Sequence, residues 1–250
     1  MTVFGDTRTR VGLRHALIAP DGLVPSVLPG ITGAVANVII SPAMGAKLTQ
    51  LLLTFAGGGR AEFVEPGVET CVYVMSGRCT ASVGGKSQLL GDGGYVFAPA
   101  DAPLVIARPK KGTRVTVFQK QFVPLASVAA PGPIFGDAAD VEGQPFLGDP
   151  DARLKTLLPD VLAFDMAVNL FTYQPGARLP FVETHIMEHG LIMLEGEGVY
   201  RLEDAWYPVT AGDAIWMAPY CPQWFVAMGK TPARYLYYKD VNRDPLGGER

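Results

Sequence analysis

The sequence predicts an all-β protein made of two similar β domains. Glycine and proline are abundant, with 29 and 21 residues among 250, which favours short strands joined by turns over long helices. Apolar runs of strand length, rich in Val, Ile, Tyr and Phe, recur along the chain. A pattern in the first half also returns in the second. The length suits either one large β domain or two domains of ordinary size.

The predicted strands fall into two sets. They cover 35–40, 48–55, 71–75, 94–98, 104–107 and 115–118, and then 167–173, 191–194, 214–218 and 235–238. A sustained helical period is rare, and only 151–158 is a candidate for a short helix. Between the sets, 129–140 is rich in Pro and Gly and then acidic, which is typical of a connector. We therefore expect domains at 1–135 and 136–250.

The two halves share a plan of strands and turns. Residues 69–77 read ETCVYVMSG and are followed by GGYVFAP at 93–99, while 188–196 read EHGLIMLEG and are followed by GDAIWMA at 212–218. Paired positions are 119 residues apart throughout. This offset far exceeds the roughly 20–50 residues of solenoid repeats and indicates a duplicated domain. Two similar sandwiches or barrels are expected.

Charge and cysteine content exclude several classes of protein. The net charge is −3, and the only short basic run is at 108–111, so we expect no nucleic-acid partner. The three cysteines are odd in number, which indicates reduced thiols rather than a disulfide framework. The first ten residues lack an apolar signal region, and no segment has about 20 uninterrupted apolar residues. A cytoplasmic protein without membrane contact is expected.

The most informative segment is 183–189, because it holds two of the three histidines of the chain. His185 and His189 lie four residues apart, with Glu183 just before them. On a strand, Glu183 and His185 would project to the same face, and a turn at 186–188 would place His189 on the adjacent strand. Imidazole and carboxylate groups together are ligands of divalent transition metals. With no thiolate required, such a site suits Mn(II) or Fe(II), with Zn(II) or Ni(II) as further options.

Other interpretations of these residues stay open. His185 and His189 have the i, i+4 spacing of a helical zinc pair, but Pro180, Gly190 and the β-rich context count against a helix. Both histidines could also be structural core residues. The third histidine, His15, stands alone and is expected to be structural or exposed. Cys221 lies two residues before Gln223 and could approach a metal, but a buried inert thiol is expected.

The spacing resembles the two motifs of the cupin superfamily. Residues 183–196 read E-x-H-x3-H-x6-G, which is the first motif with histidine and carboxylate exchanged, and 212–223 read G-x5-A-x-Y-x2-Q, in which Gln223 takes the place of the last histidine ligand. The resemblance implies two tandem jelly-roll β-barrels, a bicupin, with Gln223 as fourth ligand. An amide oxygen is a hard neutral donor and favours Mn(II).

The first half acts as an internal control for this site. Subtraction of 119 from the ligand positions gives Val64, Pro66, Thr70 and Leu104, which cannot hold a metal as the second half does. We therefore expect an N-terminal barrel that lacks metal ligands and has a structural role. A barrel that has only a structural role, together with exposed β edges, predicts a homo-oligomer.

A more specific resemblance covers nearly the whole chain. The segments ALIAPDGLV at 16–24, ETHIMEHG at 183–190 and KDVNRD at 239–244 resemble the (S)-ureidoglycine aminohydrolase family. That family hydrolyses ureidoglycine to ureidoglycolate and ammonia in purine (allantoin) catabolism, using Mn(II). The resemblance implies one Mn(II) held by Glu183, His185, His189 and Gln223. It also implies substrate contacts from Tyr200, Tyr235, Lys239 and Glu183.

Roles in catalysis follow from the same resemblance. Glu183, Tyr200 and Lys239 are the expected catalytic residues, because a carboxylate and a lysine beside a metal can share the proton transfers of hydrolysis. Lys239 would either neutralise the substrate carboxylate or donate a proton. Arg243 and Asp244 are expected to have a structural role in a C-terminal loop. Two competing functions remain: another metal-cupin enzyme such as an Fe(II) dioxygenase, and a non-enzymatic protein that uses a metal to bind a small anion.

Overall fold

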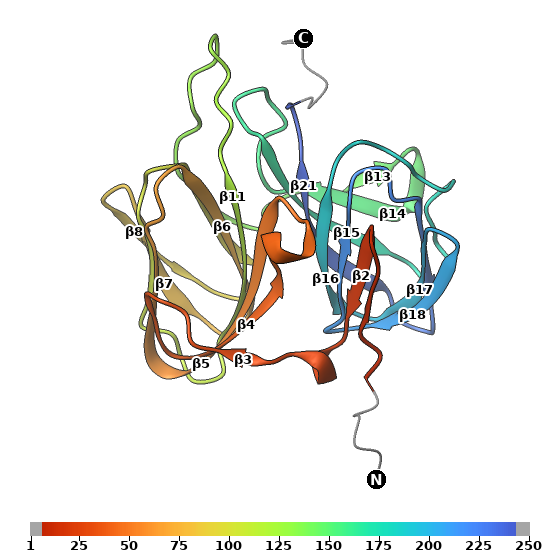
Figure 1. Cartoon of the computed structure of the whole chain (residues 1–250), viewed down its shortest axis with the longest axis horizontal. Helices are drawn as coiled ribbons and strands as arrows, with labels where there is room; N and C mark the ends of the chain where they lie inside the picture. Colours follow the sequence, from red (N-terminus) through yellow and green to blue (C-terminus); the bar gives the residue numbers. More distant parts are fainter. Residues whose placement is uncertain (1–6, 244–250) are drawn as a thin grey trace. The chain divides into compact units, whose positions relative to one another are not determined.

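The computed structural model describes residues 7–243, and within this range the chain consists of strands and turns. Helical structure in the described range is limited to two 3₁₀ turns, η1 (Pro20–Gly22) and η2 (Pro42–Met44). The all-β class predicted from composition is therefore confirmed (Figure 1). No helix in the described part of the chain is long and apolar enough to cross a membrane. Asp244, which was expected in a C-terminal loop, lies outside the described residues.

The chain divides into two compact units that are discontinuous in sequence. The first unit comprises Pro25–Glu142, Lys155–Asn169 and the chain from Tyr238, and the second comprises the chain up to Val24, Gly143–Leu154 and Leu170–Tyr237. A single boundary between 135 and 136, as expected from the sequence, does not describe this division. The N-terminal residues belong to the second unit because β2 (His15–Ile18) pairs with β19 (Ala214–Met217).

The first unit is built on one antiparallel sheet. Its strands are β3 (Pro25–Ser26), β4 (Ile31–Ile40), β5 (Leu48–Phe63), β6 (Val68–Ser76), β7 (Cys79–Val83), β8 (Lys86–Leu90), β9 (Gly94–Ala98), β10 (Leu104–Ala107), β11 (Arg114–Gln121) and β12 (Ile134–Asp137). Alternate residues such as Val72, Val74, Val115 and Val117 form its core. The segment 129–140 was expected to be a connector, but β12 within it pairs with β9 and so extends this sheet.

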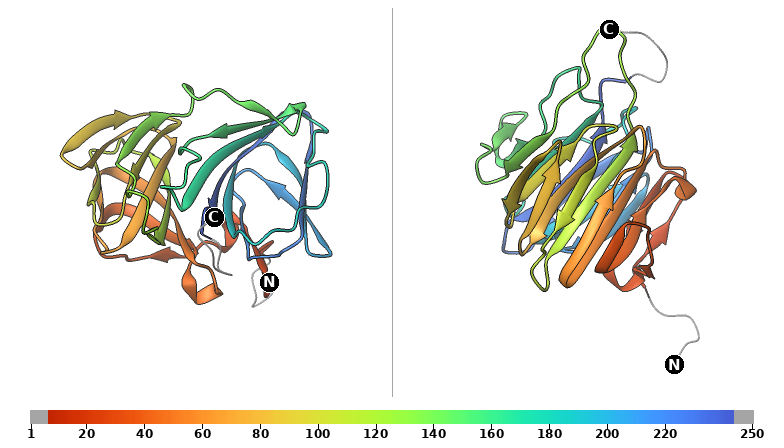
Figure 2. Two further views of the ribbon diagram at one scale, coloured as in Figure 1. Left: turned by 90° about the horizontal axis from the view of Figure 1, so that it is seen from above. Right: turned by 90° about the vertical axis from the view of Figure 1, so that its left-hand side faces the viewer.

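The second unit contains the histidine segment. Its strands are β1 (Arg10–Val11), β2, β13 (Gln144–Phe146), β14 (Asp149–Thr156), β15 (Met166–Tyr173), β16 (His189–Glu195), β17 (Glu197–Leu202), β18 (Ala205–Thr210), β19, β20 (Gln223–Met228) and β21 (Ala233–Asp240). The last residues of β14 and β21 and the first residues of β15 fall in the first unit. One sheet has the order β1-β2-β19-β16-β21-β15-β14-β13, and the other β18-β17-β20. Within each unit the strands curl around an interior (Figure 2).

The expected short helix at 151–158 is wrong, because these residues form most of strand β14. Ala152 is buried in the core of the second unit, and Leu154 packs against the same core. A spacing of two residues brings both side chains to one face of a strand, whereas on a helix they would lie about 200° apart. The two side chains that face the core, two residues apart, are therefore consistent with a strand and not with a helix.

The sequence repeat is a repeat of strand register, which confirms the duplication. In the first unit Thr70 pairs with Ala98, and in the second His189 pairs with Met217, 119 residues further on at both positions. The same offset relates the pair Leu104 and Val83 to the pair of Gln223 and Leu202. Strands that occupy corresponding places in the two units therefore carry corresponding residues.

Glycines at the ends of the repeated strands allow the turns. Gly196 has a φ of 71° and its counterpart Gly77 a φ of 90°, a conformation that residues with a Cβ rarely adopt. A Cβ on Gly196 would also lie 2.4 Å from the carbonyl oxygen of Pro232. Glycine at this position is thus needed both for the turn after β16 and for the close approach of the chain before β21.

Candidate metal centre

The interior of the second unit is lined by aromatic side chains. Strands β15, β17, β20 and β21 contribute Phe171, Tyr173, Tyr200, Phe225, Tyr235 and Tyr237 to one buried core. Tyr200 and Phe225 are direct cross-strand partners, with ring centroids 5.3 Å apart. Large rings packed in this way give the interior a rigid wall with a few phenol groups as its polar atoms.

Glu183 and Gln223 meet at an isolated antiparallel bridge. The backbone N–H of Glu183 donates to the carbonyl of Gln223 at 2.8 Å, and the N–H of Gln223 donates to the carbonyl of Glu183 at 2.9 Å. Directly opposed residues project their side chains to the same face of a sheet. The bridge therefore places a carboxylate and an amide side by side, although they are forty positions apart in sequence.

His189 and Gln223 both face Nε2 of His185. The Nε2 atoms of His185 and His189 are 3.1 Å apart, and the side-chain amide of Gln223 lies 3.0 Å from Nε2 of His185. His189 begins β16, as expected, and is 8% exposed. His185, expected on a strand, instead lies in the loop between the Glu183 bridge and β16.

The ring of His185 is held in one tautomer. Its Nδ1 lies 3.1 Å from the carbonyl oxygen of Met187, so this nitrogen carries the proton and donates it. In a neutral ring the lone pair is then on Nε2, the atom that faces His189 and Gln223. A backbone carbonyl that accepts the second ring N–H is the usual support of a metal-binding histidine.

The residues present fit a divalent metal. Two imidazole nitrogens and one amide meet at one point, where a single lone pair of His185 cannot satisfy both neighbours by hydrogen bonding. Donor atoms bound to one ion at about 2.1 Å lie about 3.0–3.4 Å apart for bond angles between 90° and 109°. The observed separations of 3.1 and 3.0 Å match this range. An amide rotated by 180° would present its oxygen, the atom that binds metals.

Glu183 is brought next to Gln223 by the backbone bridge between the two residues. Across residues 7–243 no group of three or more His, Cys, Asp or Glu side chains forms a metal-sized cluster, so the convergent donors are two imidazoles and an amide. The charge of Glu183 nevertheless reaches the interior. The pKa of Tyr200 is raised strongly, first by burial and next by the negative charge of Glu183.

The tyrosines form a hydrogen-bonded and stacked group near the histidines. The hydroxyls of Tyr173 and Tyr235 are 3.2 Å apart, and Tyr237 stacks on the ring of His189 at a centroid distance of 5.5 Å. Burial raises the pKa of Tyr235 well above its usual range, so its hydroxyl is neutral at physiological pH. Tyr200 and Tyr235, two of the four predicted substrate contacts, thus share one interior with the histidines.

The remaining predicted residue, Lys239, lies four positions beyond Tyr235 on strand β21 and is half-buried. Even spacing along a strand places Tyr235, Tyr237 and Lys239 on the same side. Lys239 belongs to the first unit, and its part in the site stays a prediction.

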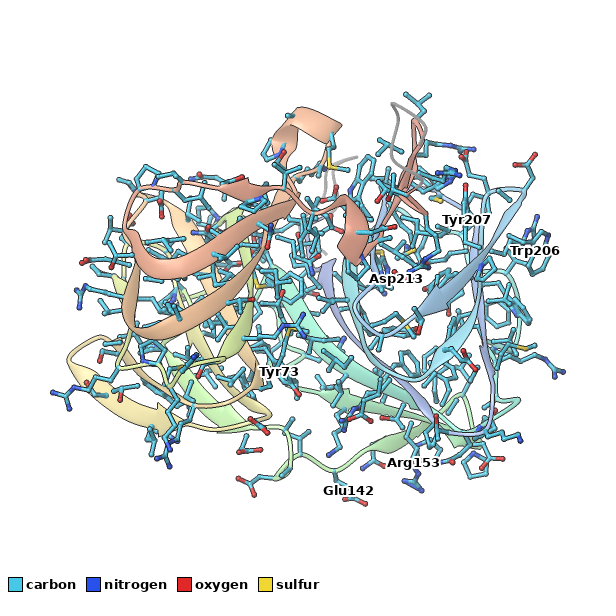
Figure 3. The ribbon with its side chains drawn as sticks, turned by 90° about the horizontal axis from the view of Figure 1, so that it is seen from below. Tyr73, Glu142, Arg153, Trp206, Tyr207 and Asp213 are labelled. Atoms are coloured by element: carbon cyan, nitrogen blue, oxygen red, sulfur yellow. The ribbon has the colours of Figure 1, made fainter. Side chains whose placement is uncertain are left out.

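Three residues that were expected to be structural make contacts typical of that role: His15, Cys221 and Arg243. His15 is 6% exposed, with Nδ1 2.9 Å from Glu203 and Nε2 2.9 Å from the hydroxyl of Tyr207, which Figure 3 labels. Cys221 is buried in the core, where burial raises its pKa to about 11 and keeps it a thiol. All three cysteines are free. Arg243 donates to the backbone carbonyls of Val123 and Leu162.

At the corresponding places the first unit has a buried leucine, a buried threonine and two exposed residues. Leu104 is fully buried, Thr70 is buried, and Val64 and Pro66 are exposed. The partner of Leu104 across the strand is Phe63, not Val64, so the 119-residue offset shifts by one at this strand. A buried phenylalanine therefore stands where the second unit has Glu183.

Sequence reasoning missed three residues near the centre. Glu188, which directly precedes His189 at the start of β16, is fully buried. It accepts a hydrogen bond of 2.7 Å from the indole N–H of Trp216. Its counterpart Glu69, also fully buried, was visible in the repeat and could have revealed it. Tyr173 and Tyr237 were the others, and for Tyr237 the alternation from Tyr235 along β21 was the available signal.

Comparisons with known proteins agree with this geometry. The Cupin domain family matches residues 169–238, which include every residue of the convergent centre. A probable (S)-ureidoglycine aminohydrolase of rice (Oryza sativa subsp. japonica) is 39% identical over 97% of this chain and 78% of its own length. The (S)-ureidoglycine aminohydrolase of Escherichia coli K12 is 36% identical over 92% of this chain and 89% of its own.

Structural comparison extends the similarity to the fold. The crystal structure of the protein Ylba from E. coli superposes with a TM-score of 0.86 at 33% identity and covers 95% of this chain and 96% of its own. The match spans both units, so the two tandem cupin barrels predicted from the motifs are confirmed. With identities of 36–39% over nearly the full length, the chain belongs to the (S)-ureidoglycine aminohydrolase family.

Proposed function

We propose that this hydrolase releases ammonia from (S)-ureidoglycine to give (S)-ureidoglycolate in purine catabolism, with Mn(II) as its metal. The observation that carries the proposal is the convergence of His185, His189 and Gln223 on one point within an aromatic interior. The family of the chain supports the substrate, and the donor set supports the metal. Nitrogen and hard oxygen donors without thiolate suit Mn(II).

His185, His189 and Gln223 would hold the metal, with Glu183 as a fourth ligand beside them. When bound, the ion would act as a Lewis acid that polarises the substrate and lowers the pKa of water. The protein supplies orientation. The Glu183 bridge fixes one carboxylate and one amide on the same face, and the Met187 carbonyl fixes the tautomer of His185. Ligands fixed before substrate arrives reduce the entropic cost of reaching the reactive geometry.

The reaction replaces one bond to the central carbon of the substrate. The carbon–nitrogen bond to the amine breaks, and a bond to a water oxygen forms. Water loses one proton, and the departing amine gains one to leave as ammonia. Glu183 is the candidate to accept the proton from water, and Lys239 is the candidate to neutralise the substrate carboxylate or to deliver the proton to the amine.

Tyr200 and Tyr235 are proposed to orient the substrate. Both are buried, at 2% and 4% exposure, and burial raises the pKa of each so that the phenols stay neutral. Neutral hydroxyls can donate hydrogen bonds to the ureido carbonyl or to the carboxylate of the substrate. Because the surrounding wall is aromatic, water is largely excluded and these hydrogen bonds are strengthened.

The test is ammonia release from freshly generated ureidoglycine by protein stripped of metal and then loaded with Mn(II). We expect ammonia release above the spontaneous rate with Mn(II), and little without it. Oxygen uptake with Fe(II) loaded should be absent, which separates the hydrolase from a dioxygenase. Mn-loaded protein that releases no ammonia above background would refute the proposal and leave the anion-binding alternative.

The cellular setting is also part of the proposal. Three free buried cysteines suit a reducing compartment, and we place the protein in the cytoplasm with a small ureido compound as its partner. We further propose a homo-oligomer, because β8 and β18 end their sheets as edge strands. Light scattering coupled to size-exclusion chromatography tests the oligomeric state.

A further inference from the structure

The hydroxyls of Tyr173 and Tyr235 form a buried pair that no predicted role explains. Their oxygen atoms are 3.2 Å apart, and the rings lie 5.8 Å apart at an interplanar angle of 30°. Each phenol has one proton to donate. If Tyr173 donates to Tyr235, the hydroxyl of Tyr235 keeps its own proton for a third group.

Tyr173 is held rigidly. It is fully buried on β15, stacks on Phe171 at 4.7 Å and meets Phe225 edge-on at 5.1 Å. A ring fixed on two sides has few rotamers left. Its hydroxyl is therefore a fixed point against which another side chain can be oriented.

Tyr235 contacts both this fixed point and a ring that stacks on His189. Its ring centroid is 6.0 Å from that of Tyr237, and Tyr237 stacks on His189 at 5.5 Å. Tyr235 is 4% exposed, whereas Tyr173 has no exposed surface. Tyr235 is thus linked through the ring of Tyr237 to His189, a proposed metal ligand, and keeps a little exposed surface. Burial and the charge of Glu183 keep the Tyr173 phenol neutral, since both raise its pKa.

We propose that Tyr173 is a positioning residue: its hydroxyl holds that of Tyr235 and directs the proton of Tyr235 toward the substrate. This inference rests on the proposed function, in which Tyr235 contacts substrate. Tyr173 itself touches neither substrate nor metal. Its removal should therefore act only through Tyr235.

The test is a double-mutant cycle in the Mn-loaded, full-length protein with Tyr173→Phe, Tyr235→Phe and the double variant. Loss of one net hydrogen bond corresponds to about a fivefold effect. We expect Tyr173→Phe to raise KM about fivefold, with kcat within about twofold and unchanged manganese content. In the Tyr235→Phe background the same change should have no further effect. Tyr95→Phe, which removes a buried phenol of the first unit, is the matched control and should keep KM unchanged.

A second readout does not depend on activity. With tyrosine labelled by ¹³C at Cζ, the resonance of Tyr235 is the one absent from Tyr235→Phe, and it should shift in Tyr173→Phe because its hydrogen-bond partner is lost. An unshifted resonance, or additive effects on KM, would overturn the positioning role even if ammonia release is normal. If the resonance shifts in Tyr173→Phe but the wild-type protein releases no ammonia, the proposed function is overturned, and with it the substrate role of the pair.

Discussion

Glu183 and Gln223 exchange two backbone hydrogen bonds, of 2.8 and 2.9 Å, across an isolated bridge. Outside this bridge the residues around Glu183 belong to no named strand. The exchange therefore ties a loop that carries His185 to the start of β20. In the first unit the corresponding pair is Phe63 and Leu104, on regular strands. The same place in the fold is thus apolar in one unit and polar in the other.

Replacement of His185 by alanine should abolish tight manganese binding. His185 is the residue that both other donors face, at 3.1 and 3.0 Å, so its loss leaves two ligands that no longer converge. Metal content after dialysis, measured by plasma mass spectrometry, checks the expectation. His15→Ala removes the third histidine of the chain, which binds Glu203 and Tyr207, and should keep the metal. Equal manganese in both variants would contradict the assignment.

Gln223→Leu should weaken manganese binding by at least about 10–100-fold, the range for loss of a hydrogen-bond partner of a ligand, because Gln223 is itself a proposed ligand. Leucine is the residue at the equivalent position 104, where it packs in a buried core, so the fold should tolerate it. Isothermal titration calorimetry of the apo-protein with Mn(II) measures the affinity. Gln50, a fully buried glutamine of the first unit, offers a control as Gln50→Leu, which should leave the affinity unchanged.

Trp216→Phe should lower the free energy of unfolding by about 1–3 kcal/mol, because the buried carboxylate of Glu188 loses its indole donor. The bond is 2.7 Å long and both residues have almost no exposed surface. Urea denaturation followed by circular dichroism measures the change. Trp206→Phe is the control: Trp206 is 57% exposed on the outer side of β18 (Figure 3), and its replacement should cost less than about 0.5 kcal/mol. Equal losses would contradict the role of the buried bond.

The stability of the protein should fall as pH rises, in a way that depends on Glu69. The pKa of Glu69 is raised to about 9, first by burial and next by the nearby Asp165, which is paired with Lys120. Between its unfolded value of about 4.5 and 9, the folded protein holds a proton that the unfolded chain has lost. The free energy of unfolding therefore decreases with pH across this window.

Glu69→Gln removes this titration and should flatten the dependence. Urea denaturation of both proteins at pH 5.5, 7.0 and 8.5 provides the comparison, in which contributions from the histidines cancel. The difference between variant and wild type should grow in favour of the variant as pH rises. Parallel curves would show that Glu69 is ionised in the folded protein, or that another group compensates.

Local patterns in the sequence predicted much of this protein. Short apolar runs between glycines and prolines located ten strands, and the 119-residue offset revealed the duplication because strand register is repeated along with the residues. The candidate metal centre was also predicted from local patterns. His185 and His189 lie in one short segment, and Gln223 follows a motif spacing.

Tertiary structure decided what depends on partners distant in sequence. The N-terminal strand β2 joins the second unit because its edge pairs with β19, about 200 positions later, and nothing local in 15–18 indicates that partner. Strand β14 was mistaken for a helix because only the core shows which of its side chains are buried. The environments of Glu188 and Tyr173 likewise arise from Trp216 and Tyr235, which long-range strand pairing and packing bring beside them. Periodicity reports local conformation, whereas burial and polar pairing depend on which distant strands meet.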